Sequence, residues 1–426
     1  MKLHAGKCLW PHYMEQVPVY PTLKDDLSCD CLIIGGGIGG ALCSYLLSLQ
    51  GISTVLVDKG TIAGGSTLAS TGLLQYASDK MLTSFIHTFG EQASVHFYRL
   101  CSLAMQRLKE IGHHLQQYQP PSKVDNPVRN SLISERATLY LASRHTDIRL
   151  LRTEYENLRK YGFTAEWWNK HKIADNLPFR RSAAIYTQND AEMDPFAYVH
   201  ALVSFAAANG VAVFENTPVT GHQFMDDKNG VICRSRDVHI HAKHVIFATG
   251  YETQEFKKDR GTSLTSTYVI VTDPVKNWGK LDPWYERCMI WETNRPYSYM
   301  RTTPDGRILA GGLDEWLHGK LMTEGRRFQK SKDLLQMVHN MIPHASNLNI
   351  DFFWEAVFGR TNDGLPYIGP HPKYPNCYFL EGYGGNGTVC TMIAAEMITD
   401  LLIGKSRPDL GIFSLIRCIK RKGYSP

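Results

Sequence analysis

The feature that most constrains this chain is a run of glycines between an apolar segment and a helical one. Cys29–Ile34 is short and apolar, as expected for a strand covered on both faces. Gly35–Gly40 follows directly with the spacing G-x-G-x-x-G, and Ala41–Gln50 then carries apolar residues at helical intervals. Ser53–Val57 predicts a second strand, which ends at Asp58. This order of strand, glycine turn, helix, strand and acid predicts a bound dinucleotide.

Each position in this turn has a chemical reason. Gly35 permits the tight turn, Gly37 lets a pyrophosphate approach the backbone, and Gly40 lets the helix pack closely on the strand. The first helical amides and the positive end of the helix dipole then face the phosphates. Asp58 lies about twenty residues beyond the glycines, where a carboxylate accepts the ribose hydroxyls. The residues expected to hold the nucleotide are Gly35, Gly37, Ile38, Gly39, Gly40, Asp58 and Lys59.

A loop of small and hydroxyl-bearing residues, Gly64–Leu74, follows the acid. Such a loop can lie flat against a long cofactor and hydrogen-bond its phosphates and ring edges. A nicotinamide dehydrogenase has no need of a loop here, whereas a flavin protein does, so the loop favours a flavin nucleotide. The residues expected to contact it are Gly65, Ser66, Thr67, Thr71, Gly72, Leu73 and Leu74.

Later segments are expected to complete the same nucleotide-binding region. Val245–Gly250 is an apolar strand that closes on Ala-Thr-Gly, and it suits a return strand packed close to the cofactor. Phe196–Asn209 predicts a helix, and a strand is expected around Pro218–Thr220, where the backbone can meet the adenine edge. The contacts expected from these segments are at Val219, Ala248, Thr249 and Gly250.

A second G-x-G-x-x-G motif, Gly382–Gly387, lies between a predicted strand and a helix over Thr388–Leu402. No second strand with an acid follows it, and about forty residues are too few for a second nucleotide unit. We therefore expect a helix N-terminus aimed at the flavin ring, where its dipole stabilises negative charge on the reduced ring. A pyridine-nucleotide reductase would need a separate NAD(P) site beside the flavin site, so the single dinucleotide site argues against this class of enzyme. The residues expected at the ring are Gly384, Gly385, Asn386, Gly387 and Thr388.

The charge pattern excludes two classes of partner. The chain has 46 Lys and Arg against 41 Asp and Glu, a formal net charge of +5 over 426 residues. A nucleic-acid-binding protein would carry a concentrated basic stripe, and the one basic run, Arg417–Lys422, is better explained as a solvated terminus. Cys31–Gln50 lacks charged residues for about the length of a membrane span. Because it contains five glycines, a packed strand-turn-helix explains it better, and we expect no membrane span and no nucleic acid.

The cysteines and histidines are not spaced in the sequence as metal ligands. None of the ten cysteines has the paired CxxC spacing of a zinc site, and Cys29 and Cys31 are expected to be buried apolar thiols. The histidines of His239–His244 fit a solvent-facing hairpin better than a metal. Met1–Tyr20 has no apolar core, so no cleavable signal peptide is expected, and reduced thiols then favour the cytoplasm.

At its glycine loops and their flanks the chain resembles the D-amino-acid oxidase / glycine oxidase family of FAD-dependent amine oxidases. The matching segments are Ile33–Gly40, Val57–Asp58, Gly64–Leu74, Asp194–Pro195, Phe247–Gly250, Tyr299–Arg301, Gly306–Gly312, Thr361–Gly369 and Gly382–Thr388. The leader Trp10–Leu23 is similar to that of the γ-glutamylputrescine oxidase branch.

The resemblance implies an α/β fold with two domains. A Rossmann-type FAD-binding domain would gather residues 26–90, 185–255 and 350–405. A second, α+β substrate domain built on an antiparallel sheet would gather residues 91–184 and 256–349. Residues 1–25 would form an N-terminal arm and residues 406–426 a C-terminal tail.

The resemblance also implies FAD-dependent oxidation of a C–N bond in a small-molecule amine or amino acid. A hydride would pass from the substrate carbon to flavin N5, the resulting imine would be hydrolysed by water, and the electrons would go to O2 or to a carrier. The alternative is a flavoprotein dehydrogenase subunit that passes electrons to a partner protein or a quinone. The sequence neither requires nor excludes a homo-oligomer.

Three residues are candidates for the catalytic site. Tyr297 aligns with a family tyrosine that lines the substrate site, with a sheet-core aromatic as the alternative. Glycine oxidases fix the substrate carboxylate with an arginine three residues before the Thr of T-x-D-G, and this chain has Phe358 there. Arg360 or Arg301 could meet a carboxylate instead, with a structural ion pair as the alternative for each. The missing arginine favours amines or larger N-substituted substrates over simple α-amino acids.

Overall fold

The computed structural model describes residues 1–118, 131–225, 229–257, 261–276, 284–317, 319, 321–382 and 384–417. The basic run at Arg417–Lys422 therefore lies almost wholly outside the described residues. The chain divides into two compact units: unit 1 is Met1–Val17, Gly65–Tyr198 and Leu264–Phe358, and unit 2 is Pro18–Gly64, Val199–Ser263 and Gly359–Pro426. The domain boundaries given above remain a prediction, because a compact unit is defined by contacts within the chain and not by the cofactor.

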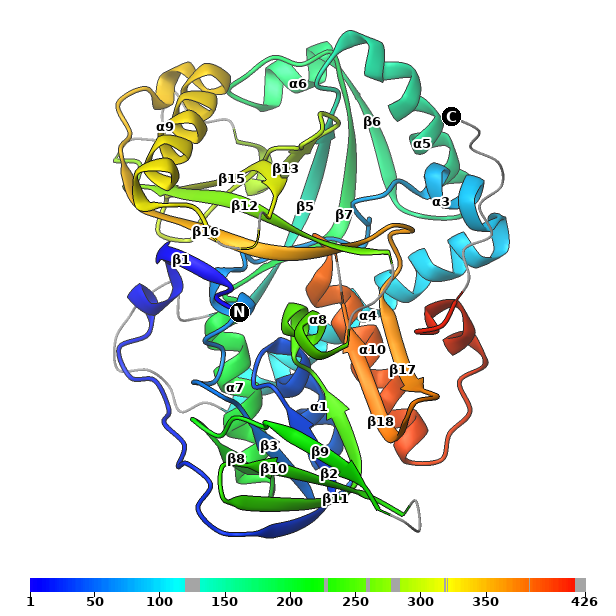
Figure 1. The fold of residues 1–426 in the computed structure, drawn as a ribbon. Coiled ribbons are helices and arrows are strands. Elements are labelled where there is room, and N and C mark those ends of the chain that lie inside the picture. Colours follow the sequence, from blue (N-terminus) through cyan, green and yellow to red (C-terminus); the bar gives the residue numbers. More distant parts are fainter. Residues whose placement is uncertain are drawn as a thin grey trace. The chain divides into compact units, whose positions relative to one another are not determined.

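Unit 2 is built on an eight-stranded sheet whose central strands are parallel (Figure 1). Its path is β17 (Tyr367–His371), β18 (Tyr374–Glu381), β11 (Val238–Phe247), β2 (Leu27–Ile34), β3 (Thr54–Val57) and β8 (Ala212–Phe214), with β10 (Val231–Ser235) and β9 (Gly221–Phe224) beside β11. Since β2 pairs in parallel with β3 and β11, β11 is the return strand expected before Gly250.

The strand expected around Pro218–Thr220 is wrong. Those three residues form no strand, and β9 begins only at Gly221. Proline has no amide hydrogen to donate to a ladder, which is the physical reason that pairing starts after it.

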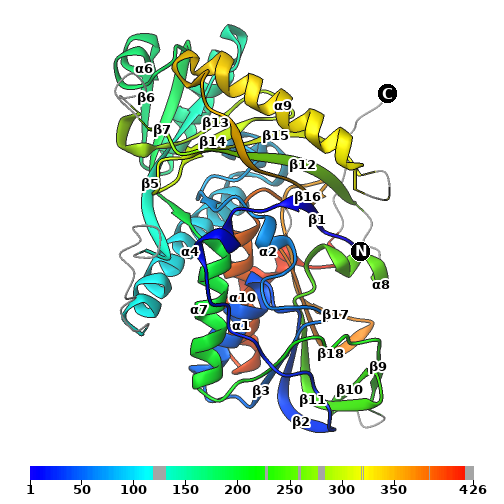
Figure 2. The same cartoon turned by 90° about the vertical axis from the view of Figure 1, so that its left-hand side faces the viewer.

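Helices of unit 2 cover one face of this sheet, and β9 and β10 lie toward the other (Figure 2). These helices are α1 (Ile38–Ser48), α10 (Gly387–Leu402) and the part of α7 (Pro195–Ala208) from Val199 onward. Leu32 and Ile34 join Phe247 in the hydrophobic core on the β9–β10 side, whereas the intervening Ile33 is buried beneath α1. The short helices of this unit are η3 (Gly250–Glu252), α8 (Thr253–Phe256) and η6 (Pro408–Phe413).

The strand-turn-helix expected over Cys31–Gln50 is confirmed by β2, the glycine turn and α1. Among the described ranges, no helix combines the length and the hydropathy that a membrane crossing requires.

Unit 1 is built on a ten-stranded sheet. Its order is β1 (His4–Lys7), β16 (Ile350–Thr361), β12 (Thr262–Thr272), β15 (Ile308–Trp316), β14 (Tyr299–Thr302), β13 (Met289–Glu292), β5 (Ile133–Leu141), β7 (Ala183–Met193) and β4 (Leu73–Leu74), with β6 (Ala165–Asn169) paired to β7. The expected antiparallel sheet is mixed, because β5 and β13 run in parallel. These two strands are distant in sequence, so no hairpin sets their relative direction.

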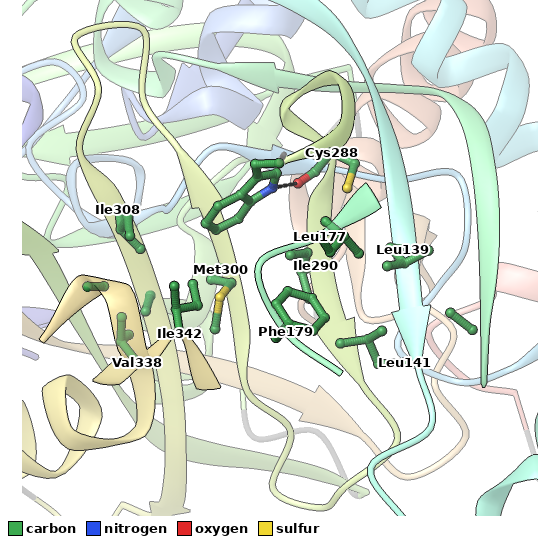
Figure 3. Close-up of a cluster of buried hydrophobic side chains, with 14 of the residues drawn as sticks. Leu139, Leu141, Leu177, Phe179, Cys288, Ile290, Met300, Ile308, Val338 and Ile342 are labelled. Carbon is green, nitrogen blue, oxygen red and sulfur yellow. Dashed lines mark hydrogen bonds between the residues drawn. The ribbon is translucent and has the colours of Figure 1, made fainter. Parts of the chain in front are cut away.

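A hydrophobic core lies between this sheet and α9 (Glu324–Met341) (Figure 3). Leu139, Ile290 and Met300 from neighbouring strands meet Val338 of the helix, and all are buried. The other helices of unit 1 are η1 (Trp10–Tyr13), α2 (Ser66–Ala69), α3 (Leu82–Phe89), α4 (Glu91–Tyr118), η2 (His145–Asp147), α5 (Ile148–Lys160), α6 (Lys170–Asn176), η4 (Tyr285–Arg287) and η5 (Pro343–Ala345). The prolines within Gln116–Asn130 predict a loop, but the first three of these residues belong to α4, and the rest lie outside the described residues.

Candidate functional site

The glycine turn of unit 2 accepts only glycine at two positions. Gly35 has a φ of +110°, and a Cβ on it would lie 2.5 Å from the Ala248 carbonyl oxygen. A Cβ on Gly40 would lie 1.9 Å from the Gly35 carbonyl oxygen. Helix α1 therefore approaches the end of β2 more closely than any side chain at Gly40 permits, which is the packing that the G-x-G-x-x-G spacing predicts.

The N-cap residue of helix α1 makes no side-chain capping hydrogen bond. Gly37 is the N-cap, Ile38 and Gly39 are the first helical residues, and the first turn contains no acidic residue. The positive end of the helix dipole is therefore not neutralised within the helix. Beside this turn, the Ala248 amide donates a hydrogen bond to the Ile34 carbonyl at 2.9 Å. A helix N-terminus of this kind is suited to bind phosphate.

Asp58 directly follows β3, next to the same turn. Its Oδ2 accepts a hydrogen bond from the Gly36 amide at 2.6 Å, and its Oδ1 accepts one from the Gly60 amide at 2.7 Å. Burial raises the pKa of Asp58, while the two amides act in the opposite direction. The neighbouring Lys59 is committed elsewhere, because its Nζ pairs with Glu252 at 2.6 Å. The carboxylate thus lies at the carboxyl end of the strand beside β2, where dinucleotide-binding folds hold a ribose.

Unit 2 contains three other residues that the sequence predicts to contact the nucleotide. Thr249 caps η3, and its hydroxyl is hydrogen-bonded to that of Thr253 at 2.8 Å. Gly250, the first residue of η3, has a φ of +55°. Val219 packs as a half-buried residue against the core that contains Phe247. A contact between Val219 and adenine remains a prediction.

The second glycine motif joins β18 to α10. A Cβ on Gly382 would lie 2.5 Å from Thr391 Oγ1, and the Gly384 amide donates to the Gly359 carbonyl at 2.8 Å. Asn386 caps α10, and its Nδ2 is buried with no hydrogen-bond partner in the part of the chain that the structure describes. The residues predicted to face the flavin in this turn and at the start of α10 are Gly384, Gly385, Asn386, Gly387 and Thr388.

The N-termini of α1 and α10 lie at the same edge of the sheet. Each helix follows the carboxyl end of a strand, β2 or β18, and both strands run parallel to β11 between them. Gly39 of α1 is close to Leu380 and Thr391, since a Cβ on it would lie 3.1 Å and 3.5 Å from their side chains. The two glycine motifs, far apart in sequence, are therefore neighbours at one end of unit 2.

A buried ion pair at this edge was not predicted from the sequence. Lys257 Nζ lies 2.8 Å from Glu381 Oε1, and the two side chains are 6% and 0% exposed. The Lys257 ammonium also lies 5.0 Å from the ring centroid of Phe379. Glu381 ends β18 directly before the second glycine motif. No sequence signal links the two charges, because the pair depends on the long-range pairing of β11 with β18.

The loop Gly65–Leu74 belongs to unit 1 and is held by β7. Gly72 has a φ of +68°, and a Cβ on it would lie 2.1 Å from the Met193 carbonyl oxygen. The Met193 amide donates to the Gly72 carbonyl at 2.9 Å, and Leu73 and Leu74 form β4. Ser66, at the start of α2 with Thr67, has a buried Oγ without a hydrogen-bond partner among the described ranges.

Arg301 is buried in a network centred on Glu192. Arg301 Nη1 lies 3.0 Å from Glu192 Oε2, and its Nε donates to the Thr71 carbonyl at 3.1 Å. Arg136 and Arg287 approach Glu192 Oε1 at 2.6 Å and 3.0 Å. One carboxylate therefore serves three guanidinium groups. These contacts favour the structural alternative for Arg301, and sequence reasoning did not identify Glu192.

An aromatic cluster covers the sheet face opposite α9. Tyr140, Trp291 and Tyr299 are in register on β5, β13 and β14, and Tyr140 and Trp291 stack at 3.9 Å. They alternate with Leu139, Ile290 and Met300, which face α9, so the aromatic side chains lie on the other face.

Tyr297 extends the same cluster. Its ring lies 6.1 Å from that of Trp291 and 6.0 Å from that of Tyr299. Its hydroxyl donates to Asp79 Oδ1 at 3.2 Å. Tyr297 is thus a half-buried aromatic residue with a satisfied hydroxyl, and its role at a substrate remains a prediction.

The position that the family uses for an arginine is Phe358 on β16, the last residue of unit 1. Arg360, two residues on, is half-buried and follows Gly359, which accepts the hydrogen bond from Gly384. Arg360 therefore belongs to unit 2 and is adjacent in sequence to the residue that hydrogen-bonds the second glycine motif.

The expected hairpin at the histidine-rich segment is confirmed by the pairing of β10 with β11, on which His239 and His241 are exposed. In the part of the chain described, no group of three or more His, Cys, Asp or Glu side chains is arranged to hold a metal ion.

The parallel sheet, the glycine turn and the acid at the end of β3 define a dinucleotide-binding protein of the Rossmann class. The chain matches the model of the FAD dependent oxidoreductase (DAO) family over residues 30–401 and belongs to that family. The expected fold class, family and cofactor are thereby confirmed. The protein is an FAD-dependent oxidoreductase that acts on C–N bonds.

Individual relatives agree. The chain is 24% identical to glycine oxidase of Bacillus subtilis (strain 168) over 88% of its length and 93% of the relative's. It is 23% identical to gamma-glutamylputrescine oxidoreductase of Escherichia coli (strain K12), over 90% of its length and 86% of the relative's. Its fold is similar to that of glycine oxidase from Geobacillus kaustophilus, with a TM-score of 0.77, 19% identity and coverage of 92% and 99% of the two chains.

The residues present fit FAD. At Gly35 and Gly40 a Cβ would collide with backbone, so these two positions of the turn can present only main-chain atoms to a ligand. Asn386 in unit 2 and Ser66 in unit 1 each have a buried polar atom without a hydrogen-bond partner in the described ranges. Buried polar atoms are nearly always satisfied in native proteins, so both atoms are suited to a ligand rich in hydrogen-bonding groups.

Proposed function

We propose that the chain oxidises amines or N-substituted amino acids in preference to simple α-amino acids. The observation that carries this proposal is the aromatic cluster of unit 1, combined with a phenylalanine at the position where the family has a carboxylate-binding arginine. An aromatic surface attracts an alkylated ammonium group by cation–π interaction, whereas it provides no partner for an α-carboxylate.

In unit 2 we propose that FAD is held by the following residues: Gly35, Gly37, Ile38, Gly39, Gly40, Asp58, Lys59, Val219, Ala248, Thr249, Gly250, Gly384, Gly385, Asn386, Gly387 and Thr388. In unit 1 the proposed contacts are Gly65, Ser66, Thr67, Thr71, Gly72, Leu73 and Leu74. When bound, FAD supplies the hydride acceptor for the oxidation. The chain's own residues bind, orient and desolvate the substrate.

Tyr297 is proposed to orient the amine. Its hydroxyl is already directed by Asp79, and its ring is fixed against Trp291 and Tyr299, so the side chain is preorganised. The Asp79 carboxylate and the Arg295 guanidinium, which lies 5.2 Å from the Tyr297 ring centroid, carry opposite charges at this ring, so the attraction for a cationic ligand is assigned to the aromatic faces.

The two arginines have different proposed roles. Arg360 is proposed to bind an acidic substituent when the amine carries one, because its guanidinium is half-buried beside the second glycine motif. Arg301 is proposed to position the Thr71 loop rather than to touch the substrate, since Glu192 and the Thr71 carbonyl occupy it.

A substrate panel tests this proposal. Holoenzyme is mixed without oxygen with primary amines, diamines, N-methyl amino acids and unsubstituted α-amino acids, and bleaching of the flavin band is followed. Amines or N-substituted compounds should reduce the flavin fastest. Fastest reduction by glycine or another simple α-amino acid would contradict the proposal.

Two variants locate the site. Tyr297→Phe should retain FAD and slow flavin reduction about tenfold or more, because one oriented hydrogen bond is lost. Tyr155→Phe on α5, where the ring packs on Trp167, is the matched control and should leave the rate unchanged. Equal rates in both variants would remove Tyr297 from the site.

The electron acceptor is tested with the same substrate in air. Stoichiometric peroxide supports an oxidase that uses O2, whereas turnover only with an artificial dye supports the alternative, a dehydrogenase that passes electrons to a partner or quinone.

We also propose a cytoplasmic location, because the nine described cysteines are all free thiols, eight of them buried. Fractionation of cells that express the chain checks this, and recovery in an oxidising compartment would contradict it.

A further inference from the structure

Unit 1 contains a cavity of about 430 Å³ on the α9 side of its sheet. Leu141, Ile290 and Met300 line it from β5, β13 and β14, and Met337 and Met341 line it from α9. Figure 3 shows Leu141, Ile290 and Met300 on adjacent strands of this face. Thioether side chains adapt to ligands of different shape, so one side of the cavity is a deformable apolar surface.

Charged groups of both signs line the same cavity. Arg181 precedes β7, Glu292 ends β13, and Asp333 lies on α9. Within the described ranges, none of the three belongs to an ion pair, so Arg181 lies more than 4.0 Å from both carboxylates. Opposite charges that share a cavity without meeting each other leave room for a ligand between them.

Contacts hold the Arg181 guanidinium in place, but not all of its hydrogen-bond donors have an acceptor. Its Nη1 donates to the Arg180 carbonyl at 3.1 Å, and its guanidinium lies 5.9 Å from the ring centroid of Phe179. Its Nε is buried and has no hydrogen-bond partner in the described part of the chain. A buried donor without an acceptor is costly, and a ligand carboxylate would supply the acceptor through a charge-assisted hydrogen bond.

We propose that this cavity is a second ligand site, for a free apolar amino acid. The ligand's carboxylate binds Arg181, its ammonium group binds between Glu292 and Asp333, and its side chain contacts Met300, Met337 and Met341. The cavity volume is within the range of small-molecule sites. Neither a plain fatty acid nor a plain amine matches both charges.

The site adjoins the aromatic cluster at Tyr299, which also lines the cavity, but most of its lining lies on the α9 side of the sheet. Its apolar residues face α9, whereas Tyr140 and Trp291 alternate with them onto the other face of the sheet. The two sites share β14, on which Tyr299 and Met300 both line the cavity. Occupancy of the cavity therefore acts on the strand that carries Tyr299, which gives the bound amino acid a route to regulate turnover.

Calorimetric titration of the oxygen-free holoenzyme tests the proposal, with L-leucine, L-methionine and 4-methylpentanoate, which is leucine without its amino group, as probes. Both amino acids should bind saturably and 4-methylpentanoate about tenfold or more weakly. Arg181→Gln should weaken the amino acids about tenfold to a hundredfold. Arg180→Gln is the matched control, since it removes an adjacent exposed charge that does not line the cavity.

A second variant and the flavin spectrum separate this site from the substrate site. Glu292→Gln/Asp333→Asn should abolish the preference for leucine over 4-methylpentanoate. Tyr297→Phe should leave leucine binding unchanged, and binding should not bleach the flavin band. Three outcomes would overturn the proposal: no saturable heat with either amino acid, equal losses in Arg180→Gln and Arg181→Gln, or loss of leucine binding in Tyr297→Phe.

Discussion

Replacement of Glu192 by glutamine tests the charge network that holds the Thr71 loop. Glutamine keeps the shape and one hydrogen-bond acceptor of glutamate but removes its charge. Arg301 and Glu192 have side chains that are 2% and 5% exposed, so water cannot take over the interaction. The other two guanidinium groups, on Arg136 and Arg287, are 18% and 37% exposed and are partly solvated.

The expected cost follows from this burial. Removing one partner of a buried ion pair costs about 3–5 kcal/mol, because the other charge stays buried without compensation. We assign this cost to the Arg301 pair alone, since pairs with partly exposed partners add little. Burial, together with Arg136 and Arg301, already lowers the pKa of Arg287, and Glu192 is the group that opposes this. For a domain of about 150–250 residues, the loss corresponds to a fall in Tm of roughly 6–20 °C.

Thermal unfolding of the holoenzyme, followed by flavin release and by tryptophan fluorescence, measures this fall. Glu135→Gln is the matched control, because Glu135 lies on β5 beside the same strand but is exposed and pairs with Lys109 at 3.8 Å. It should shift Tm by no more than about 1–2 °C. If Glu192→Gln unfolds at the wild-type temperature, the network contributes no net stability and the reasoning is wrong.

Three further predictions concern other parts of the chain. Gly40→Ala should abolish FAD binding, since its Cβ would lie 1.9 Å from the Gly35 carbonyl oxygen. Gly221→Ala, whose Cβ would have no atom within 4 Å, is the control and should bind FAD normally. The flavin content of the purified variants measures both. Lys257→Met should lower the free energy of unfolding by about 3–5 kcal/mol, because Glu381 stays buried and uncompensated. In urea unfolding, the Lys257→Met/Glu381→Gln double variant should recover most of this loss. Burial raises the pKa of Asp190 to about 6, so the folded state holds this proton more tightly than the unfolded chain and the residue's contribution to stability falls as pH rises toward 6. Relative to wild type, the free energy of unfolding of Asp190→Asn should therefore rise by roughly 3 kcal/mol between about pH 4 and pH 8. A difference in Tm between the two proteins that does not change with pH would contradict the assignment.

Local patterns in the sequence predict the nucleotide-binding half of the molecule well. The order of strand, glycines, helix and acid around Gly35 and Asp58 is contiguous, so each step is visible in neighbouring residues. The return strand was predictable for the same reason, because a continuous apolar run before Gly250 suits only a buried strand.

Long-range contacts explain what the sequence does not predict. Glu192 acquires its three arginines, and Glu381 its lysine, from segments that meet only after the sheets have formed. The direction of β13 relative to β5 is likewise not encoded in a hairpin. Arg301 looked equally suited to a ligand and to an ion pair, and only its burial beside Glu192 distinguishes the two.

Quantitative reduction without oxygen tests the central claim most directly. Holoenzyme is titrated with an amine that bleaches its flavin, and reduced flavin is compared with the carbonyl product released after hydrolysis. The account predicts one carbonyl product for each flavin reduced, in the same chain that fails to take up FAD when Gly40 is replaced by alanine. Flavin that stays oxidised with every amine and amino acid, or a purified protein that binds no FAD, would contradict it.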